Sequence, residues 1–347
     1  MYLLSLASRV PTQSYTQSDC WEIIQQSDVL SKLTPRSGYL LDRILNNQNG
    51  IDKRHFAIDD MSQLFSRTPQ ALNEDFQRSA PALAGDALRG ALEQAKLRAK
   101  DLDALIVCTC TGYLCPGVSS YVAEQLGLRG DCYLQDLVGL GCGAAIPTLR
   151  NAAGFLAANP KAKIGVIAVE ICSAAFFVND DPGVLVSLCL FGDGASASIW
   201  TGNPPGENAW RMTDFDTIHQ PENRELLRFV NHEGFLRNQL DLTVPQRAGE
   251  AVRTLYERQQ PTGKVVAHAG GRDVIEALRE VLPGQKLAES ESVLRQYGNV
   301  SSPSVLMALE AQLAKPDDVD DLWLTSFGAG FAAHACRMAL EHFSCYL

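Results

Sequence analysis

The sequence predicts an α/β fold, because strand-like apolar runs alternate with helix-like segments along most of the chain. Residues 102–110 predict a strand and residues 118–126 a helix; residues 132–138 and 143–158 repeat the pair. The chain has 347 residues, of which 46% are hydrophobic and 20% charged. That composition is typical of a globular protein with a sizeable core, arranged as one large domain or two.

The alternation continues on both sides of a composition change. Residues 164–171 and 195–200 predict two more strands, and the segment 201–208 (Thr-Gly-Asn-Pro-Pro-Gly-Glu-Asn) has the turn residues of a linker. Beyond this segment, the pattern resumes in three further elements, at residues 265–268, 273–281 and 322–326.

We therefore expect two similar halves, residues 1–205 and 206–347, although no repeated residue pattern proves a duplication. The stretch before about residue 85 differs from the rest. Residues 19–31 and 36–46 have helical periodicity, so this stretch is expected to be a helical region attached to the N-terminal half.

Charge and cysteine usage exclude several classes of function. A net charge of −10, without any dense Lys/Arg run, argues against a nucleic-acid partner. The start of the chain, Met-Tyr-Leu-Leu-Ser-Leu-Ala, lacks the basic and long apolar parts of a secretion signal, so the ten cysteines are expected to be reduced and the protein cytoplasmic. No apolar run of about 18 residues is present to cross a bilayer, and we expect no membrane partner.

Cys142 is the strongest candidate for a reactive residue. It lies in Leu-Gly-Cys-Gly-Ala-Ala, where a predicted strand meets a predicted helix. The N–H groups and the dipole at a helix N-terminus stabilise a thiolate, so the sequence predicts a lowered pKa for this thiol. A thiolate exchanges acyl groups with thioesters, which indicates acyl transfer more than hydrolysis.

His268 and Asn299 are the candidate partners of Cys142. Each follows a predicted segment and is flanked by small residues, in Ala-His-Ala-Gly-Gly and Tyr-Gly-Asn-Val-Ser-Ser. An imidazole donates a hydrogen bond from its ring N–H, and an amide offers two donors without any charge. If the three residues converge, the two donors form an oxyanion or enolate site beside the thiol.

Other interpretations of the same residues stay open at this level. The alternatives are that Cys142 is a small buried hydrophobe, His268 a structural histidine and Asn299 a turn residue. Residues 139–144 and 328–333 both match the G-x-G-x-x-A pattern of an NAD-dependent oxidoreductase, with Glu170 as its acidic residue.

Two more motifs point away from metal and protease chemistry. The order Cys, His, Asn also occurs in papain-like proteases, but Cys142 lacks the aromatic residue that follows their nucleophile segment. Cys108, Cys110 and Cys115 are poorly spaced for zinc, and no companion pair follows them, so we expect no metal site.

Four segments in the same order resemble the type III polyketide synthases, the chalcone synthase-like enzymes of the thiolase fold. The resemblance runs from about Arg54 to Arg337. Its four segments are Gly-Leu-Gly-Cys142-Gly-Ala, Leu-Phe191-Gly-Asp-Gly-Ala, His268-Ala-Gly-Gly, similar to the family's His-Pro-Gly-Gly, and Tyr-Gly-Asn299-Val-Ser-Ser, similar to its Tyr-Gly-Asn-Met-Ser-Ser.

The resemblance implies a thiolase-like α/β fold, with two similar halves stacked as layered helices and mixed sheets. It also implies that Cys142 loads an acyl-CoA starter, which decarboxylative condensation with malonyl-CoA extends at His268 and Asn299 before the polyketide cyclises. CoA thioesters are then substrates, no metal or redox cofactor is needed, and the enzyme is a homodimer.

The resemblance assigns further residues to the site. Phe191 matches the Phe that separates the CoA tunnel from the cavity. The positions that match cavity-lining residues are Cys110, Thr111, Cys115, which would reach across the dimer, Cys172, Ala175 and Ser301. The candidates for contact with CoA phosphates are Arg43, Lys53 and Arg54, for which solvated surface charge is an equal alternative.

The sequence also departs from the family pattern. Ala269 replaces a Pro, and Ser326-Phe-Gly-Ala-Gly replaces Gly-Phe-Gly-Pro-Gly, which leaves the shape of the cyclisation pocket open. The nearest alternative is a β-ketoacyl carrier-protein synthase III, whose histidine segment usually reads His-Gln-Ala-Asn. An inactive scaffold of the same fold is the alternative from a different class, and the intact set of three residues argues against it.

Overall fold

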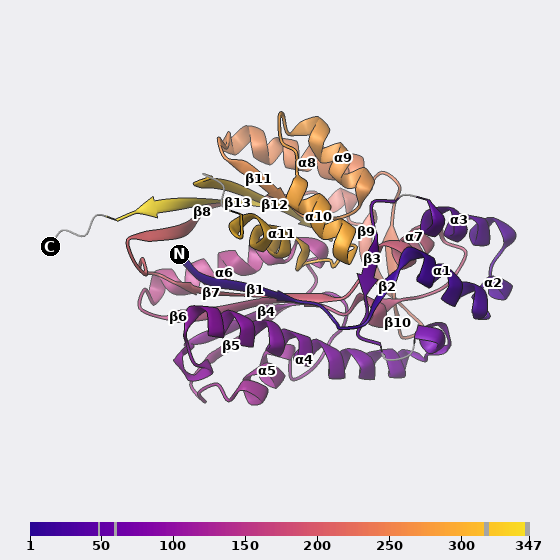
Figure 1. Cartoon of the computed structure of the whole chain (residues 1–347), viewed down its shortest axis with the longest axis horizontal. Coiled ribbons are helices and arrows are strands. Elements are labelled where there is room, and N and C mark those ends of the chain that lie inside the picture. The colour runs from indigo at the N-terminus through magenta and orange to yellow at the C-terminus, as the bar shows by residue number, and fades with distance from the viewer. Residues whose placement is uncertain (48, 59–60, 316–318, 344–347) are drawn as a thin grey trace.

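The computed structural model of the chain describes residues 1–47, 49–58, 61–315 and 319–343. Its elements form five layers, in which helices and sheets alternate (Figure 1). One outer layer contains α4 (Pro69–Ala95) and α5 (Val118–Leu126), and the other contains α8 (Val244–Gln259) and α9 (Arg272–Val281). The middle layer contains α6 (Ala145–Ala158) and α11 (Ser304–Leu313). The predicted α/β class is therefore confirmed.

Two sheets separate these helical layers. The strands of the first sheet, in spatial order, are β5 (Tyr133–Leu137), β4 (Ala104–Cys108), β6 (Lys163–Glu170), β7 (Gly194–Thr201) and β1 (Tyr2–Arg9). Those of the second are β8 (Asn208–His219), β13 (Ala332–His342), β12 (Asp321–Gly328) and β11 (Lys264–Ala267). A single pair, Tyr2 with Arg211, connects β1 to β8 and so joins the two sheets.

The two sheets repeat one pairing order. In the first, β4 is parallel to β6, β6 is antiparallel to β7, and β7 is antiparallel to β1. In the second, β11 is parallel to β12, and β12, β13 and β8 are antiparallel in the same way. The segment between β7 and β8 contains the predicted boundary at residue 205. The division into two halves stays a prediction, which this repeated order supports.

The N-terminal stretch is not only helical, and here the prediction was wrong. β1 pairs with β7 over nearly its whole length and belongs to the first sheet. Its apolar pattern is interrupted by Ser5 and Ser8, whose hydroxyls bond to the Ala91 carbonyl at 2.6 Å and to Ser196 Oγ at 2.8 Å. Because these polar positions are satisfied only by tertiary contacts, local periodicity does not reveal the strand.

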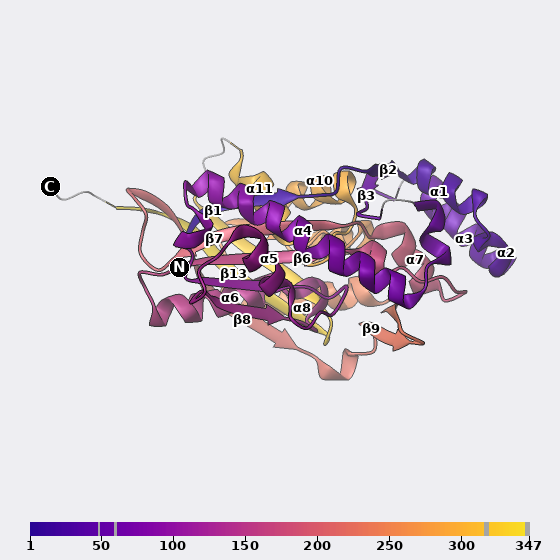
Figure 2. The ribbon, with the colours of Figure 1, turned by 90° about the horizontal axis from the view of Figure 1, so that it is seen from below.

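The helix expected over residues 19–31 is divided into two. Ser27 ends the first part, because its N–H bonds back to the Ile23 and Ile24 carbonyls while its hydroxyl accepts the Val29 N–H. Figures 1 and 2 place most of the remaining elements together at one end of the molecule. The remaining helices and strands are α1 (Gln17–Gln26), α2 (Val29–Lys32), α3 (Pro35–Asn46), α7 (Pro182–Leu190), α10 (Ala288–Tyr297), β2 (Ser14–Thr16), β3 (Lys53–His55), β9 (Leu227–His232) and β10 (Phe235–Leu240).

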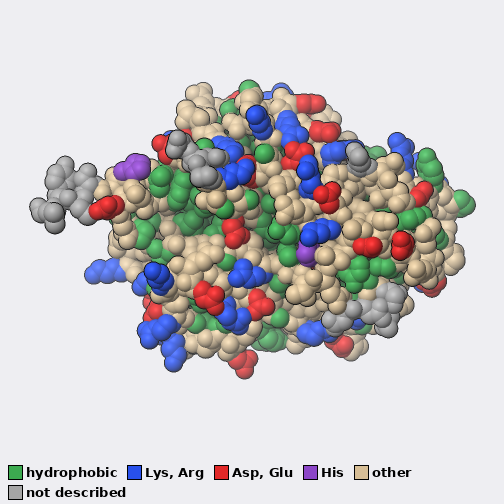
Figure 3. Space-filling view, viewed as in Figure 1, with side chains coloured by type: hydrophobic (Ala, Val, Ile, Leu, Met, Phe, Trp, Pro, Cys, Tyr) green, Lys and Arg blue, Asp and Glu red, His purple; other side chains and the backbone are tan. Residues whose placement is uncertain are grey.

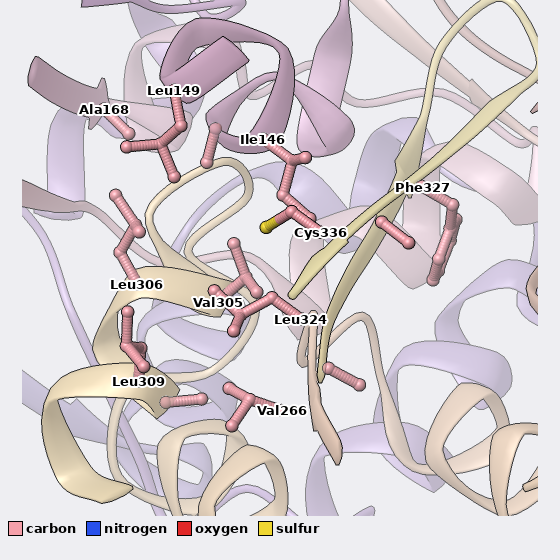
Figure 4. Packing of buried hydrophobic residues seen from close by; sticks show 14 of the residues in the cluster. Ile146, Leu149, Ala168, Val266, Val305, Leu306, Leu309, Leu324, Phe327 and Cys336 are labelled. Atoms are coloured by element: carbon pink, nitrogen blue, oxygen red, sulfur yellow. The ribbon is translucent and has the colours of Figure 1, made fainter. Parts of the chain in front are cut away.

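The largest core cluster lies where the middle helices pack against the two sheets. Figure 4 shows Ile146 and Leu149 of α6, Leu306 and Leu309 of α11, and residues of β11, β12 and β13 around them. These side chains are almost fully buried, which fixes the N-terminal ends of α6 and α11 relative to each other.

The surface has mixed charge. On the face in Figure 3, Lys and Arg side chains are interspersed with Asp and Glu. Across the described part of the chain, no helix is long and apolar enough to span a bilayer.

Candidate active site

A cavity of about 500 Å³ brings together the three residues on which the sequence analysis centred. Cys142, His268 and Asn299 line it, although the chain separates them widely. α3, α7, the β9–β10 hairpin and the first residue of α8 contribute the apolar part of its wall, through Leu40, Ile44, Val186, Leu190, Leu227, Leu240 and Val244. The convergence that the sequence could only suggest is thus present.

Glycine packing positions Cys142. The residue lies in a single 3₁₀ turn, Gly141–Gly143, between β5 and α6. Gly141 has φ +59°, and a Cβ there would lie 2.8 Å from the Ala329 nitrogen; a Cβ on Gly143 would lie 3.0 Å from the Phe327 carbonyl carbon. The glycines thus let the turn approach the β12–β13 connection. Gly141 and Gly143 therefore face protein backbone, which explains these two glycines of the 139–144 pattern without a dinucleotide.

The Cys142 thiol is buried and hydrogen-bonded. Its side chain lies 8% exposed, and Ser301 Oγ is 3.3 Å from Sγ. Burial raises the pKa of Cys142 to about 12, so the expected lowering by the helix N-terminus is not met. α6 begins only at Ala145, and desolvation of the thiolate outweighs the favourable dipole. The thiol is protonated near neutral pH.

His268 is a neutral imidazole. It directly follows β11, is 1% exposed, and its ring meets the Phe327 ring edge-on at 5.2 Å between centroids. Burial lowers the pKa of His268 to about 3. No described residue hydrogen-bonds to its Nδ1. A neutral imidazole has one N–H donor and one acceptor, so this side chain can donate to an oxygen anion without carrying a charge.

Asn299 has a fixed amide orientation. Its Oδ1 accepts the Ser301 N–H at 2.8 Å, and its Nδ2 donates to the Gly270 carbonyl at 3.0 Å. One N–H of Nδ2 remains for a ligand in the cavity. Ser301, which holds the amide oxygen, has φ +56°, a conformation that non-glycine residues adopt rarely and that here places its hydroxyl beside Cys142.

The main chain at Phe191 is paired with the main chain at Asn299. The two residues form an isolated parallel β-bridge, in which the Asn299 N–H bonds to the Leu190 carbonyl at 2.9 Å and the Gly192 N–H to the Asn299 carbonyl at 3.1 Å. The Phe191 ring is buried and lines the same cavity. Phe191 directly follows the last residue of α7, and its role as a gate stays a prediction.

Glu170 is a buried carboxylate beside the site. From the sequence, no role in acyl transfer was predicted for it. Its side chain accepts hydrogen bonds from Thr111 Oγ1 at 2.9 Å, Ser302 Oγ at 2.5 Å and the Cys110 N–H at 2.9 Å. Burial raises its pKa, and these bonds oppose the rise. A single acidic residue at the end of an otherwise apolar strand was the signal that could have identified it.

The predicted cavity-lining residues are divided among several places. Cys110 lies near Ser301, at 3.4 Å between Sγ and Oγ, and lines a second cavity of about 590 Å³. Thr111, Cys172 and Ala175 are buried and line neither of these two cavities. Cys115 is exposed.

The three candidates for CoA contact also differ. Arg43 on α3 is exposed and lines the first cavity, as does Arg272 at the start of α9, which the sequence analysis missed. Lys53 is exposed outside that lining. Arg54 was wrongly assigned: it is 2% exposed, and its guanidinium donates to Gln17 and to main-chain carbonyls, so no phosphate can reach it.

No metal-binding arrangement is present in the described part of the chain, where no group of three or more His, Cys, Asp or Glu side chains has suitable geometry. The nine described cysteines are all free.

Comparisons with known proteins show which family this chain belongs to. A family model described as FAE1/type III polyketide synthase-like protein matches residues 1–219. The chain is 30% identical to a 1,3,6,8-tetrahydroxynaphthalene synthase of Streptomyces peucetius subsp. caesius, over 93% of this chain and 89% of that protein. It is 28% identical to a 3,5-dihydroxyphenylacetyl-CoA synthase of Streptomyces toyocaensis, over 76% and 73%.

The fold has the same relatives. The crystal structure of PKS-I from the brown alga Ectocarpus siliculosus superimposes with a TM-score of 0.88 at 22% identity, and the match covers 98% of each chain. At this identity the likeness concerns the fold alone, and it confirms the thiolase-like architecture that the resemblance implied.

Proposed function

This chain belongs to the FAE1/type III polyketide synthase-like family, and from that membership we propose that Cys142, His268 and Asn299 carry out its condensation reaction. The protein is a condensing acyltransferase that acts on CoA thioesters. The observation that carries the assignment of residues is their convergence on one largely apolar cavity, with a thiol, a neutral imidazole and an oriented amide.

In the first step, Cys142 takes the starter acyl group. The thiolate attacks the thioester carbonyl, and CoA leaves as its thiolate and is then protonated, so the exchange of one thioester for another is close to thermoneutral. Because the pKa of Cys142 is raised to about 12, the proton must leave as the attack occurs. The neutral imidazole of His268 is the available acceptor in the same cavity, and it passes this proton to the departing CoA thiolate, so it is neutral again before the second step.

In the second step, malonyl-CoA loses CO₂. The carbon–carbon bond to the carboxylate breaks, and its electron pair forms an enolate on the thioester. Asn299 offers one free N–H and His268 its ring N–H to that enolate oxygen, and neither residue carries a charge that would have to be neutralised. The enolate carbon then attacks the acyl carbonyl, the carbon–sulfur bond to Cys142 breaks, and Cys142 leaves as a thiolate. The lengthened chain is now a CoA thioester, which transfers back to Cys142 for the next extension.

The cavity mouth suits a CoA thioester. Arg43 and Arg272 lie at the lining where phosphates would arrive, while leucine and valine side chains line the way inward. We assign the phosphates to these two arginines and the narrow apolar part to the pantetheine arm. Arg272 also contacts Asp273 and Glu276, so Arg43 is expected to contribute more to binding.

The second cavity is assigned to the growing polyketide and its cyclisation. Cys110 and Gly141 line it on the side of the nucleophile, and Tyr113 and Val138 line it near the surface. Both of the latter side chains are exposed, as are Tyr133 and Leu134 on β5, the edge strand of the first sheet.

An exposed apolar edge of this kind suits a second copy of the chain, so we propose a homodimer that closes the second cavity. Cys115, also exposed, would then reach toward the partner. Sedimentation velocity should give a dimer for the native chain and a monomer after Val138→Arg. A native monomer that turns over at full rate would contradict this assembly.

The test of the function uses purified protein with malonyl-CoA and a panel of acyl-CoA starters. We expect release of CO₂ and formation of polyketide products without NAD(P)H or added metal, identified by mass spectrometry. Transfer from acyl carrier protein but not from CoA would indicate the carrier-protein synthase instead. Absence of both reactions would leave the inactive scaffold.

A further inference from the structure

The C-terminal end of α7 carries Phe191, and its carbonyl groups are satisfied in an unusual way. The last carbonyls of any helix lack partners within the helix. Here the Leu188 and Phe191 carbonyls accept from Arg54 Nη1, at 2.6 and 2.9 Å. The Cys189 carbonyl accepts from Gln17 Nε2 at 2.9 Å, and the Leu190 carbonyl from the Asn299 N–H at 2.9 Å.

Arg54 is buried without a counter-ion among the described residues. Its Nε donates to Gln17 Oε1 at 2.9 Å, its Cζ lies 5.1 Å from the centre of the Phe56 ring, and no described carboxylate forms an ion pair with it. A buried cation costs free energy unless its donors are fully used. At the negative end of a helix dipole, with several carbonyls to satisfy, a planar guanidinium is well suited to this place.

The same side chain also packs against the strand of Asn299. A Cβ on Gly298 would lie 2.9 Å from Arg54 Cγ and 2.7 Å from the Leu190 carbonyl oxygen, so the segments of Arg54, Leu190 and Gly298 are in close contact. Arg54 is therefore in contact with both ends of the bridge between Phe191 and Asn299.

We propose that Arg54 is a positioning residue of the condensation site, which holds Phe191 and, through the bridge, Asn299 in register. This inference rests on the proposed roles of Phe191 and Asn299. It replaces the assignment of Arg54 to CoA phosphates with a structural role, since the guanidinium bonds to Gln17 and to main-chain carbonyls. The substrate never touches Arg54; loss of its bonds frees two carbonyls and lets the bridge shift.

The main test compares Arg54→Lys and Arg54→Met with the native chain. A shift of the bridge by a fraction of an ångström should lower kcat for condensation by roughly 10- to 100-fold. KM for malonyl-CoA should stay within about twofold and keep its native salt dependence, because no phosphate contact is lost. The fraction of decarboxylated malonyl-CoA that is captured in product should fall, and the lysine variant should recover part of both losses.

Two controls separate positioning from general instability. Glu289 is equally buried and held by Lys264 and Lys315, so Glu289→Gln should lower the Tm without changing the captured fraction. In an Asn299→Ala background, Arg54→Lys should add little further loss of capture, because the proposed effect of Arg54 on capture passes through the Asn299 amide. If Arg54→Met does not fold, Arg54→Lys and Gln17→Leu, which removes the bond to the Cys189 carbonyl, give the same comparison.

A readout without activity keeps this inference separate from the proposed function. Amide hydrogen exchange at Gly192 and Asn299, whose N–H groups form the bridge, should be faster in Arg54→Lys than in the native chain. Native exchange at both amides would overturn the inference whether or not the enzyme condenses. So would an increased, salt-dependent KM with unchanged kcat, which would return Arg54 to CoA binding.

Discussion

The two middle-layer helices begin at the same site but present opposite chemistry to it. α6 follows Cys142, a nucleophile that must give up a proton, whereas α11 follows Asn299 and Ser301, which offer hydrogen-bond donors to the site. His268 follows β11 and belongs with the second group. One repeated arrangement of strands and helices thus supplies an acyl carrier from the first sheet and uncharged donors from the second.

The difference between a nucleophile that gives up a proton and uncharged donors explains why both kinds of residue can share one largely apolar cavity. The burial that raises the pKa of Cys142 to about 12 lowers that of His268 to about 3, so both are neutral at rest. Catalytic side chains that hold no charge before substrate arrives can stabilise an enolate through hydrogen-bond donors alone. The comparison therefore predicts that acyl carriage and decarboxylation can be removed separately.

The largest expected effect is the loss of acyl carriage. Cys142→Ala should abolish elongation completely, because no other described residue occupies the position of the thiol at the end of β5. Decarboxylation of malonyl-CoA should continue, since His268 and Asn299 remain. Release of ¹⁴CO₂ and product analysis measure the two activities in parallel. Loss of both together would mean that the thiol also takes part in decarboxylation.

The reciprocal substitution removes one of the hydrogen-bond donors, Asn299. Asn299→Ala should lower malonyl decarboxylation by about 10²- to 10³-fold, which is the usual effect of removing one oxyanion donor. Loading of Cys142 from an acyl-CoA should be affected much less. Single-turnover loading, followed by mass spectrometry, makes the comparison. Equal losses in loading and decarboxylation would break the division of labour between the two sheets.

The reactivity of Cys142 should depend steeply on pH. With a pKa near 12, the thiolate fraction rises about tenfold per pH unit from pH 7 to 9, so alkylation by iodoacetamide should rise by roughly 100-fold over this range. The same measurement on Cys142→Ala gives the part of the alkylation that comes from the other cysteines. A plateau beginning near pH 6 would instead indicate a preformed thiolate–imidazolium pair.

The smallest expected effect concerns stability, where the two sheets respond to pH with opposite sign. His268, with a pKa of about 3, and His334 of β13, with about 4, both lie below the ordinary 6.5. The stability that each neutral imidazole contributes to the fold is fully present above pH 6.5. It is lost as the pH falls toward these pKa values, and the loss is about 2 kcal/mol for each histidine at pH 5.

Asp193, at the start of the first sheet's β7, shifts the other way. Burial raises its pKa from 3.8 to about 6, so its ionised form weakens the fold at pH 7, and acidification to pH 5 restores roughly 1 kcal/mol. Urea unfolding at both pH values measures the net change. His334→Gln should reduce the loss on acidification by about 2 kcal/mol; an unchanged loss would show that this imidazole titrates normally.

The sequence predicts the structural features that depend on local residue pattern. The strand and helix around Cys142 lie within a residue or two of their predicted bounds, because buried strands and an alanine-rich helix follow from apolar periodicity. Cys142, His268 and Asn299 were all identified from residues that match a family motif at the ends of such elements.

What the sequence missed depends on contacts between distant segments. β1 contains serines that only α4 and β7 satisfy, and Glu170 gains its partners from loops far along the chain. The thiol pKa was predicted in the wrong direction because the dipole is a local property, whereas desolvation depends on everything that covers the cysteine. Arg54 was misassigned for a similar reason, since burial of a cation cannot be read from its neighbours in sequence.

The most direct test of the central claim is the location of the acyl group. The native protein should be mixed with an acyl-CoA in the absence of malonyl-CoA, quenched in acid and digested, and the cysteine-containing peptides analysed by mass spectrometry. We expect the acyl mass on Cys142 and on no other described cysteine. An acyl group on a different residue, or product formation by Cys142→Ala at the native rate, would contradict the assignment.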